Sequence, residues 1–278
     1  MSTQDYTSKF QKPKGLDILT PQPKEDRLPI GSSGFTNHTF IGDLWKLVLK
    51  FDVGDTRIRF IPSIAPSPYE WMFKLDVYKD KAGVTFVAPS TWDPNAVDPF
   101  KKAFFWLRKN KPEVLYSRDA NPTGFKLFTS QVGIAWCIDL GESGGIRIFQ
   151  SSLYDGVRGG TVGLAANIFK QANDVDTEPG SETAGQKLHG DITDVETGKS
   201  VKITKTKTDK AEFASYSASI GRVALPLGPL LEKLVEGEID KLVPIENVVK
   251  KLSEDEIHDI LIGYIGNELH SEIFPERK

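Results

Sequence analysis

The middle of the chain is a series of short runs that are rich in β-branched and aromatic residues and are separated by turn residues. These runs cover approximately residues 45–51, 57–61, 71–78, 84–88, 125–129, 131–140 and 146–150. Such residues favour strands, and many short strands with few helices are typical of small antiparallel barrels. We therefore expect a mainly β fold of the α+β class, built as a Greek-key barrel with helical insertions.

Helical patterns interrupt the strands twice and then dominate the end of the chain. The Asp-Pro pair that opens residues 98–110 predicts a capped helix there, and a second helix is expected over 161–171. In residues 229–278 the apolar positions recur at helical spacing, and Ser253 with Glu256 has the pattern of a capping box. We expect a helical C-terminal segment.

The first 38 residues are rich in proline, glycine and serine, so an extended arm is expected there. This divides the chain into an arm over 1–38, a barrel core over 39–228 and an acidic helical segment over 229–278. No apolar stretch is long enough to span a bilayer, and the polar start does not have the pattern of a secretory signal. We therefore expect a cytoplasmic protein.

Metal and disulfide chemistry have little support in the sequence. The single cysteine, Cys137, lies in an apolar run and excludes an internal disulfide. The four histidines are scattered and give no spacing typical of a zinc site. We expect a buried structural thiol and no metal or other cofactor.

The net charge of −3 conceals a division along the chain. Residues 45–170 hold 17 basic and 12 acidic side chains, whereas residues 171–278 hold 13 and 21. Residues 229–278 alone hold six basic and twelve acidic side chains. A basic body followed by an acidic end suits a protein that meets a polyanion with one part only, although a solvated acidic face on a helical segment explains the same numbers.

The tripeptide Gly198-Lys199-Ser200 has the ending of a phosphate-binding loop, but its surroundings do not fit one. The earlier glycine of that motif is replaced by Thr193, and a β-branched strand follows where a helix is required. We expect a hairpin instead, with Lys202, Lys205, Lys207 and Lys210 on its first strand. Lysines on an exposed strand either protect a sheet edge or track a phosphate backbone.

Basic and aromatic residues alternate on several predicted strands and on the helix near residue 100. In Arg57-Ile58-Arg59-Phe60 the two arginines share one face and the apolar residues share the other. Rings that stack on unpaired bases and cations that follow phosphates together bind single strands without reading sequence. Packing in the core is the alternative for each ring taken alone. The candidate nucleic-acid-binding residues are Arg57, Arg59, Lys74, Tyr78, Lys101, Lys102, Trp106, Arg108, Lys109, Lys111, Tyr116, Arg118, Phe125, Lys126, Phe128, Trp136, Lys202, Lys205, Lys207 and Tyr216.

The stretch 54–63, with Arg57-Ile58-Arg59-Phe60-Ile61-Pro62, resembles the first barrel strand of the bacteriophage single-stranded DNA-binding proteins related to the T-even helix-destabilising protein. The resemblance covers roughly residues 40–230, and the matching segments occur in the same order as in that family. It includes a strand with Trp71 and Tyr78, a helical insertion, the run Trp136-Cys137-Ile138-Asp139, the run Ile146-Arg147-Ile148-Phe149, a short helix near Asn167-Ile168-Phe169, and a final hairpin over 190–227.

The resemblance implies an OB-fold-like core that binds single-stranded DNA in phage replication, recombination or repair, in the host cytoplasm. It implies no enzymatic activity. Many members carry a cysteine-rich zinc module in the insertion, but this chain has no cysteine there, so zinc is not implied. The resemblance also implies that the acidic end either binds replication or recombination proteins or competes with DNA for the binding groove. That end is helix-patterned here, which favours docking to a partner or to a second copy.

Two other functions compete with this interpretation. Asp174 with Asp176, or Asp191 with Asp194 and His189, would serve as Mg²⁺ ligands in a nuclease, but aspartates are also common in turns for backbone reasons. A virion or scaffold protein would use the arm and the C-terminal helices for subunit contacts, and its basic residues would only be solvated.

Overall fold

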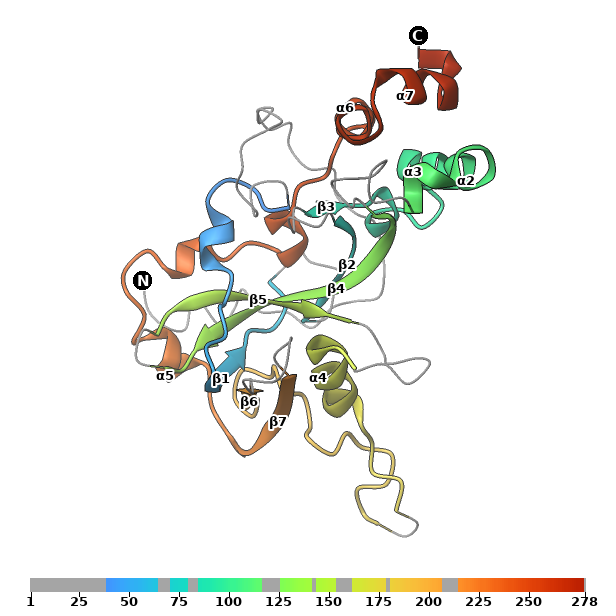
Figure 1. Ribbon diagram of the computed structural model, residues 1–278. Coiled ribbons are helices and arrows are strands. Elements are labelled where there is room, and N and C mark those ends of the chain that lie inside the picture. Colours follow the sequence, from blue (N-terminus) through green and yellow to red (C-terminus); the bar gives the residue numbers. More distant parts are fainter. Residues whose placement is uncertain are drawn as a thin grey trace. The chain divides into compact units, whose positions relative to one another are not determined.

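A computed structural model describes residues 39–64, 71–79, 85–116, 126–141, 144–153, 162–178, 181–206 and 215–277 (Figure 1). The expected arm over 1–38 lies outside this part of the chain. Within the described residues, no helix is both long and apolar enough to cross a membrane.

The protein has an α+β fold around a mostly antiparallel sheet of seven strands, which confirms the expected class, but the sheet is not closed. The strand order is β3-β2-β4-β1-β6-β7, and β5 pairs with β4 beside this path. The strands are β1 (Gly54–Phe60), β2 (Phe73–Lys79), β3 (Thr85–Val87), β4 (Lys126–Asp139), β5 (Ile146–Ser152), β6 (Lys199–Thr206) and β7 (Ser215–Ala224).

The helices are α2 (Pro99–Asn110), α3 (Pro112–Tyr116), α4 (Leu164–Asn173), α5 (Gly228–Leu231), α6 (Glu254–Ile265) and α7 (Asn267–Ile273). Short 3-10 turns are η1 (Leu44–Leu47), η2 (Pro89–Thr91), η3 (Ile239–Lys241), η4 (Ile245–Val248) and η5 (Pro275–Arg277). The predicted helix over 98–110 is confirmed as α2, whose first backbone N–H groups are capped by the Asp98 carboxylate. The helix expected over 161–171 is α4, and the capping box of Ser253 and Glu256 opens α6.

The chain forms two compact units, and strands β2 and β4 contribute residues to both. The described residues of Lys46–Lys74 and Val132–Val248 make up the first unit. The second unit consists of the described residues of Leu75–Gln131 and Val249–Lys278, together with residues 39–45.

In the first unit the strands β5, β4, β1, β6 and β7 follow one another in antiparallel pairs. β5 and β7, at the two ends of this series, are not paired with each other in the described residues. Helix α4 packs against both of them (Figure 1). The core on this face contains Ile58, Phe60, Ala135, Cys137, Phe149, Ile168, Val201, Ile203 and Ile220.

The opposite face of β4 and β5 is buried as well. Ile134, Trp136 and Ile148 are almost inaccessible to solvent. The indole Nε1 of Trp136 donates a hydrogen bond to the carbonyl of Val243 at 2.8 Å. The backbone N–H of Leu49 donates to the carbonyl of Ile148 on β5 at 2.9 Å. Strands β4 and β5 are therefore covered on both sides.

The expected C-terminal segment over 229–278 is not a separate body. Its residues up to Val248 belong to the first unit, and those from Val249 onward belong to the second. In the second unit, Leu261 of α6 and Phe274 after α7 pack in one core with Phe100 and Leu107 of α2. The apolar face of the segment is therefore buried within the protein.

A pair of buried histidines joins α6 to α7 in the second unit. Nδ1 of His258 lies 2.8 Å from Nε2 of His270, and the Phe274 ring packs against both imidazoles. Each side chain is about 5% exposed. Burial lowers the pKa of both histidines, and the nearby Arg277 acts in the same direction. At the same pH, the buried pair therefore binds fewer protons than two solvent-exposed histidines would.

We expect the second unit to lose stability as the pH falls from 7.5 to 5.5. The unfolded chain takes up protons below a pKa of about 6.5, whereas the folded pair takes them up only at lower pH, so protonation favours unfolding in this window. Urea unfolding followed by circular dichroism at several pH values measures the effect. A double variant, His258→Leu with His270→Met, should reduce this pH dependence, and His189→Ala should leave it unchanged. Equal pH dependence in the double variant and the wild type would contradict this role.

Candidate nucleic-acid interface

Arg59 does not reach the surface that the sequence predicted for it. Its side chain is fully buried, and its guanidinium donates to four backbone carbonyls. The acceptors are the carbonyls of Leu225 (2.9 Å), Ile192 (2.9 Å), Phe60 (2.5 Å) and Asp194. Burial lowers the pKa of Arg59 to about 10, while Asp191 and Asp194 act in the opposite direction, so the charge is kept at neutral pH. The prediction of a phosphate contact at Arg59 is wrong, because this group cross-links the turn over 191–198 to the sheet.

The same turn explains the Gly198-Lys199-Ser200 sequence. A Cβ atom at Gly198 would collide with the Arg59 guanidinium and with the carbonyl of Asp194. Gly198 is therefore required by a close approach and not by phosphate binding, and Lys199 begins β6 as expected for a strand. The predicted hairpin is confirmed as β6 and β7.

Two predicted stacking residues are also buried. Tyr78 is inaccessible, and its hydroxyl donates to the carboxylate of Asp98 at 2.7 Å. Burial and the neighbouring Asp98 raise the pKa of Tyr78. Trp136 is 2% exposed and lies on the covered face of β4. Neither ring can stack on a base in this structure, so the prediction of base contacts is wrong for both.

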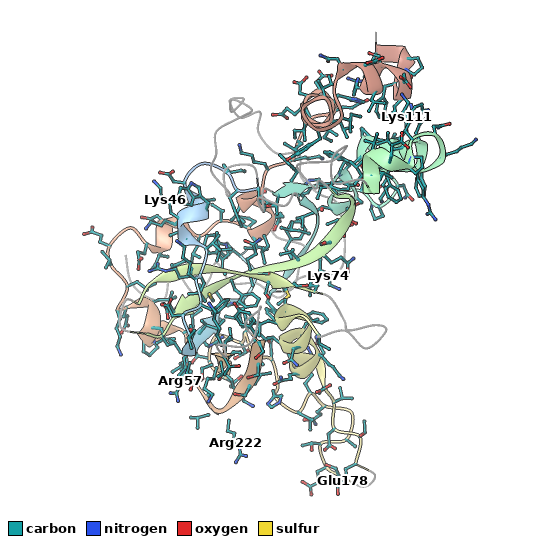
Figure 2. The ribbon with its side chains drawn as sticks, in the orientation of Figure 1. Lys46, Arg57, Lys74, Lys111, Glu178 and Arg222 are labelled. Carbon is teal, nitrogen blue, oxygen red and sulfur yellow. The ribbon has the colours of Figure 1, made fainter. Side chains whose placement is uncertain are left out.

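The cations of β1 and β6 divide between the two faces of the sheet. Arg57 is exposed and lies opposite Lys202 in the β1–β6 register (Figure 2). Lys202 also forms an ion pair with Asp55 at 3.3 Å, so an anion lies among these cations. Lys205 is three residues further along β6 and therefore lies on the other face. Among the described cations of β1 and β6, Lys205 is the one that lies beside aromatic rings.

Lys205, Tyr216 and Phe51 form a cluster, which we call the Tyr216 cluster, at the ends of β6 and β7. Lys205 and Tyr216 are directly opposite in the register, and the ammonium lies 5.9 Å from the Tyr216 ring centroid. The same ammonium donates to the Phe51 carbonyl at 2.6 Å, and the two rings meet edge to face at 6.0 Å. Tyr216 remains 42% exposed and Lys205 is half-buried, so the cluster presents to solvent a ring with a cation beside it.

A second exposed cation and ring occur where β2 lies near α4 in the first unit. Lys74 is exposed, and its ammonium lies 5.0 Å from the centroid of the Phe169 ring (Figure 2). Phe169 in turn stacks on the buried Trp71 at 6.2 Å. Phe51 and Phe169 were not among the predicted residues. Phe51 ended a predicted strand and Phe169 lay in a predicted helix, and nothing in their local sequence marks either one as half-exposed.

The remaining basic candidates lie on and just after α2, in the second unit. Lys102 pairs with Glu276 at 2.7 Å, and Lys111 pairs with Glu272 at 2.9 Å. Lys111 also lies 6.0 Å from the centroid of the half-buried Trp106. The other candidates on this helix, Lys101, Arg108 and Lys109, are exposed.

Six predicted residues are not placed in detail. Arg118, Phe125 and Lys207 lie outside the described residues, and for Tyr116, Lys126 and Phe128 only the backbone is described. Their predicted contacts with nucleic acid stay predictions.

The aspartates of the competing nuclease interpretation hold turns together. Asp176 accepts hydrogen bonds from the Ser181 and Thr183 hydroxyls, each at 2.6 Å. Asp194 accepts from the backbone N–H of Thr197 at 2.8 Å. Among the residues that the structure describes, no group of three histidine, cysteine, aspartate or glutamate side chains is arranged to hold a metal ion.

Comparison with known proteins gives no relative: no protein-family model matches the chain, and no curated protein matches it significantly.

We expect Arg59→Lys to destabilise the protein by about 3 kcal/mol or more. A single ammonium cannot serve four carbonyls, and each buried carbonyl left unpaired costs about 1–3 kcal/mol. Arg57→Lys, on the same strand but exposed, is the matched control and should change the free energy of unfolding by less than about 0.5 kcal/mol. Urea denaturation measures both. Unchanged stability in Arg59→Lys would show that the buried network does not hold the turn.

Proposed function

We propose that the protein binds single-stranded DNA in a sequence-tolerant manner and acts in phage DNA replication, recombination or repair, in the host cytoplasm. The observation that carries the proposal is the Tyr216 cluster, in which a half-exposed ring and a cation lie side by side at one end of the β6–β7 pair. Such a pair binds a base through its ring and a phosphate through its charge.

The connections between the strands support an OB-fold-like core in the first unit. Apart from the insertion that contains β2 and β3, the strands β1, β4 and β5 are consecutive along the chain and pair in that order. β6 then pairs with the other side of β1. The resulting order β6-β1-β4-β5 is that of a Greek key. With β7 added and α4 between β5 and β6, the five strands resemble the partly open Greek-key barrel of an OB-fold.

This correspondence favours the Tyr216 cluster over other surfaces. OB-folds bind oligonucleotides on the face of their second and third strands and with the loops after the first and fourth strands. Residues 133–138 of β4 are buried on both faces here, as are Ile146, Ile148 and Phe149 of β5, so this part of that face is closed to a ligand. The β6–β7 connection corresponds to the loop after the fourth strand, and Lys205 and Tyr216 lie on the two strands that it joins. Contact with a partner through the acidic residues of 229–278 stays part of the proposal.

We expect Tyr216→Ala to weaken oligo-dT binding by about 1–3 kcal/mol, with little change in salt dependence, because a stacking contact releases few counterions. Lys205→Ala removes the cation of the cluster and should make the slope of log K against log salt shallower by about 0.7, the value for one phosphate contact. Fluorescence anisotropy across a salt series measures both quantities.

Two variants control this experiment. Tyr216→Phe keeps the ring and should bind as the wild type does. Val223→Ala removes a residue that is 79% exposed on the same strand and should also have no effect. If Tyr216→Ala binds like the wild type, or if duplex DNA binds as tightly as oligo-dT at moderate salt, the cluster is not a stacking site.

A further inference from the structure

Helix α2 of the second unit carries a stripe of exposed residues, which we call the Phe105 stripe. It consists of Lys101, Phe105, Arg108 and Lys109. The last three lie four, seven and eight residues after Lys101. Residues at these spacings share one side of a helix, and the eight residue steps from the first to the last span about 12 Å along its axis. The opposite side of α2, with Phe100, Ala103 and Leu107, is buried in the core.

Phe105 is unusual because it is 63% exposed, whereas its neighbour Phe104 is partly buried against the core of the second unit. The two rings meet edge to face at 5.5 Å, which leaves much of the Phe105 ring in solvent. In the sequence, Phe105 lies in a run of apolar residues next to cations, so that core packing and an exposed position are both open for it. The structure shows a ring that contributes little to the core and lies between cations.

The charge of α2 is entirely positive. Its sequence contains no aspartate or glutamate, and Lys111 follows its last residue. Lys102 and Lys111, which lie off the stripe, are paired with Glu276 and Glu272. The three cations of the stripe make no ion pair with any described residue, so the stripe is open to an anionic ligand.

Helix stability does not explain this arrangement. Cations in the last turn, such as Arg108 and Lys109, are favourable because they offset the helix dipole. Lys101 lies in the first turn, where the dipole disfavours a cation, and exposure of Phe105 to water is unfavourable as well. Both features are explained if the stripe binds an anionic ligand that also has flat apolar surfaces.

We infer that the Phe105 stripe is a second binding site for single-stranded nucleic acid, in which Phe105 stacks on a base and Lys101, Arg108 and Lys109 contact phosphates. The inference rests on the proposed function and extends it to the second unit. An acidic peptide would match the charges of the stripe but would make no use of the exposed ring, so a nucleic-acid strand fits better.

The test compares full-length variants by fluorescence anisotropy with oligo-dT of increasing length, across a salt series. Phe105→Ala should weaken binding of long oligonucleotides by about fivefold or more, while Phe105→Leu, which keeps apolar volume without a ring, should weaken it similarly. Replacing Lys101, Arg108 and Lys109 together by glutamine should make the salt slope shallower by about 2, since three phosphate contacts are lost.

Matched controls come from the same unit. Lys102→Gln with Lys111→Gln removes two cations that are already paired and should change the slope much less than the triple variant does. Val97→Ala removes an apolar side chain that is 85% exposed and should have no effect. Circular dichroism should show all variants folded, because the replaced side chains are exposed or half-exposed.

The outcomes separate this inference from the proposed function. If Tyr216→Ala weakens binding and both Phe105 variants bind like the wild type, the stripe is not a stacking site and the proposed function remains. If the triple variant loses binding to poly-glutamate but keeps its affinity for oligo-dT, the stripe binds acidic peptides instead. If the wild type binds no single strand, both proposals are wrong.

Discussion

The buried guanidinium of Arg59 is the interaction on which the first unit depends most. It donates to carbonyls on β1 itself, on the turn over 191–198 and after β7, so one side chain fixes three segments that are far apart in sequence. A buried charge is tolerated only where its donors are satisfied, and here backbone carbonyls satisfy them. Gly198 has no side chain because the guanidinium occupies that space. The turn that precedes β6, and with it the position of the final hairpin, follows from this contact.

Much of the fold could be predicted because it depends on local patterns. The alternation around Ile58 and Phe60 correctly assigned both residues to the core, and the Asp98 cap and the Ser253 capping box marked two helix starts correctly. Alternation tells which face of a strand a residue lies on, but not what covers that face. Arg57 and Arg59 share a face, and only the turn over 191–198 distinguishes the exposed residue from the buried one. Contacts of this kind between distant segments cannot be read from sequence spacing.

A network of ring contacts explains which aromatic candidates are buried and which are exposed. Ring contacts in the first unit form a chain from Tyr216 through Phe51, Phe149, Phe60 and Trp71 to Phe169. The middle members are core residues, and the two end members each lie beside a lysine, Lys205 and Lys74. An aromatic residue near a cation in sequence is therefore a poor guide to a binding site. A ring at either end of this series of contacts is available to a ligand, whereas a ring in the middle of the series is not.

The charge asymmetry along the chain does not correspond to a basic body and a separate acidic appendage in the structure. The acidic end is not one appendage, since its first part completes the first unit and its last part completes the core of the second. Two of its glutamates, Glu272 and Glu276, pair with the lysines of α2 and its following residue that lie off the Phe105 stripe. The net charge of a segment therefore does not predict the electrostatic potential around it, because local ion pairs neutralise part of that charge. Among the described residues, the positive charge that remains unpaired on α2 is confined to the side that also exposes a ring, and it is this coincidence of charge and aromatic surface that favours a proposed binding site over a solvated helix face.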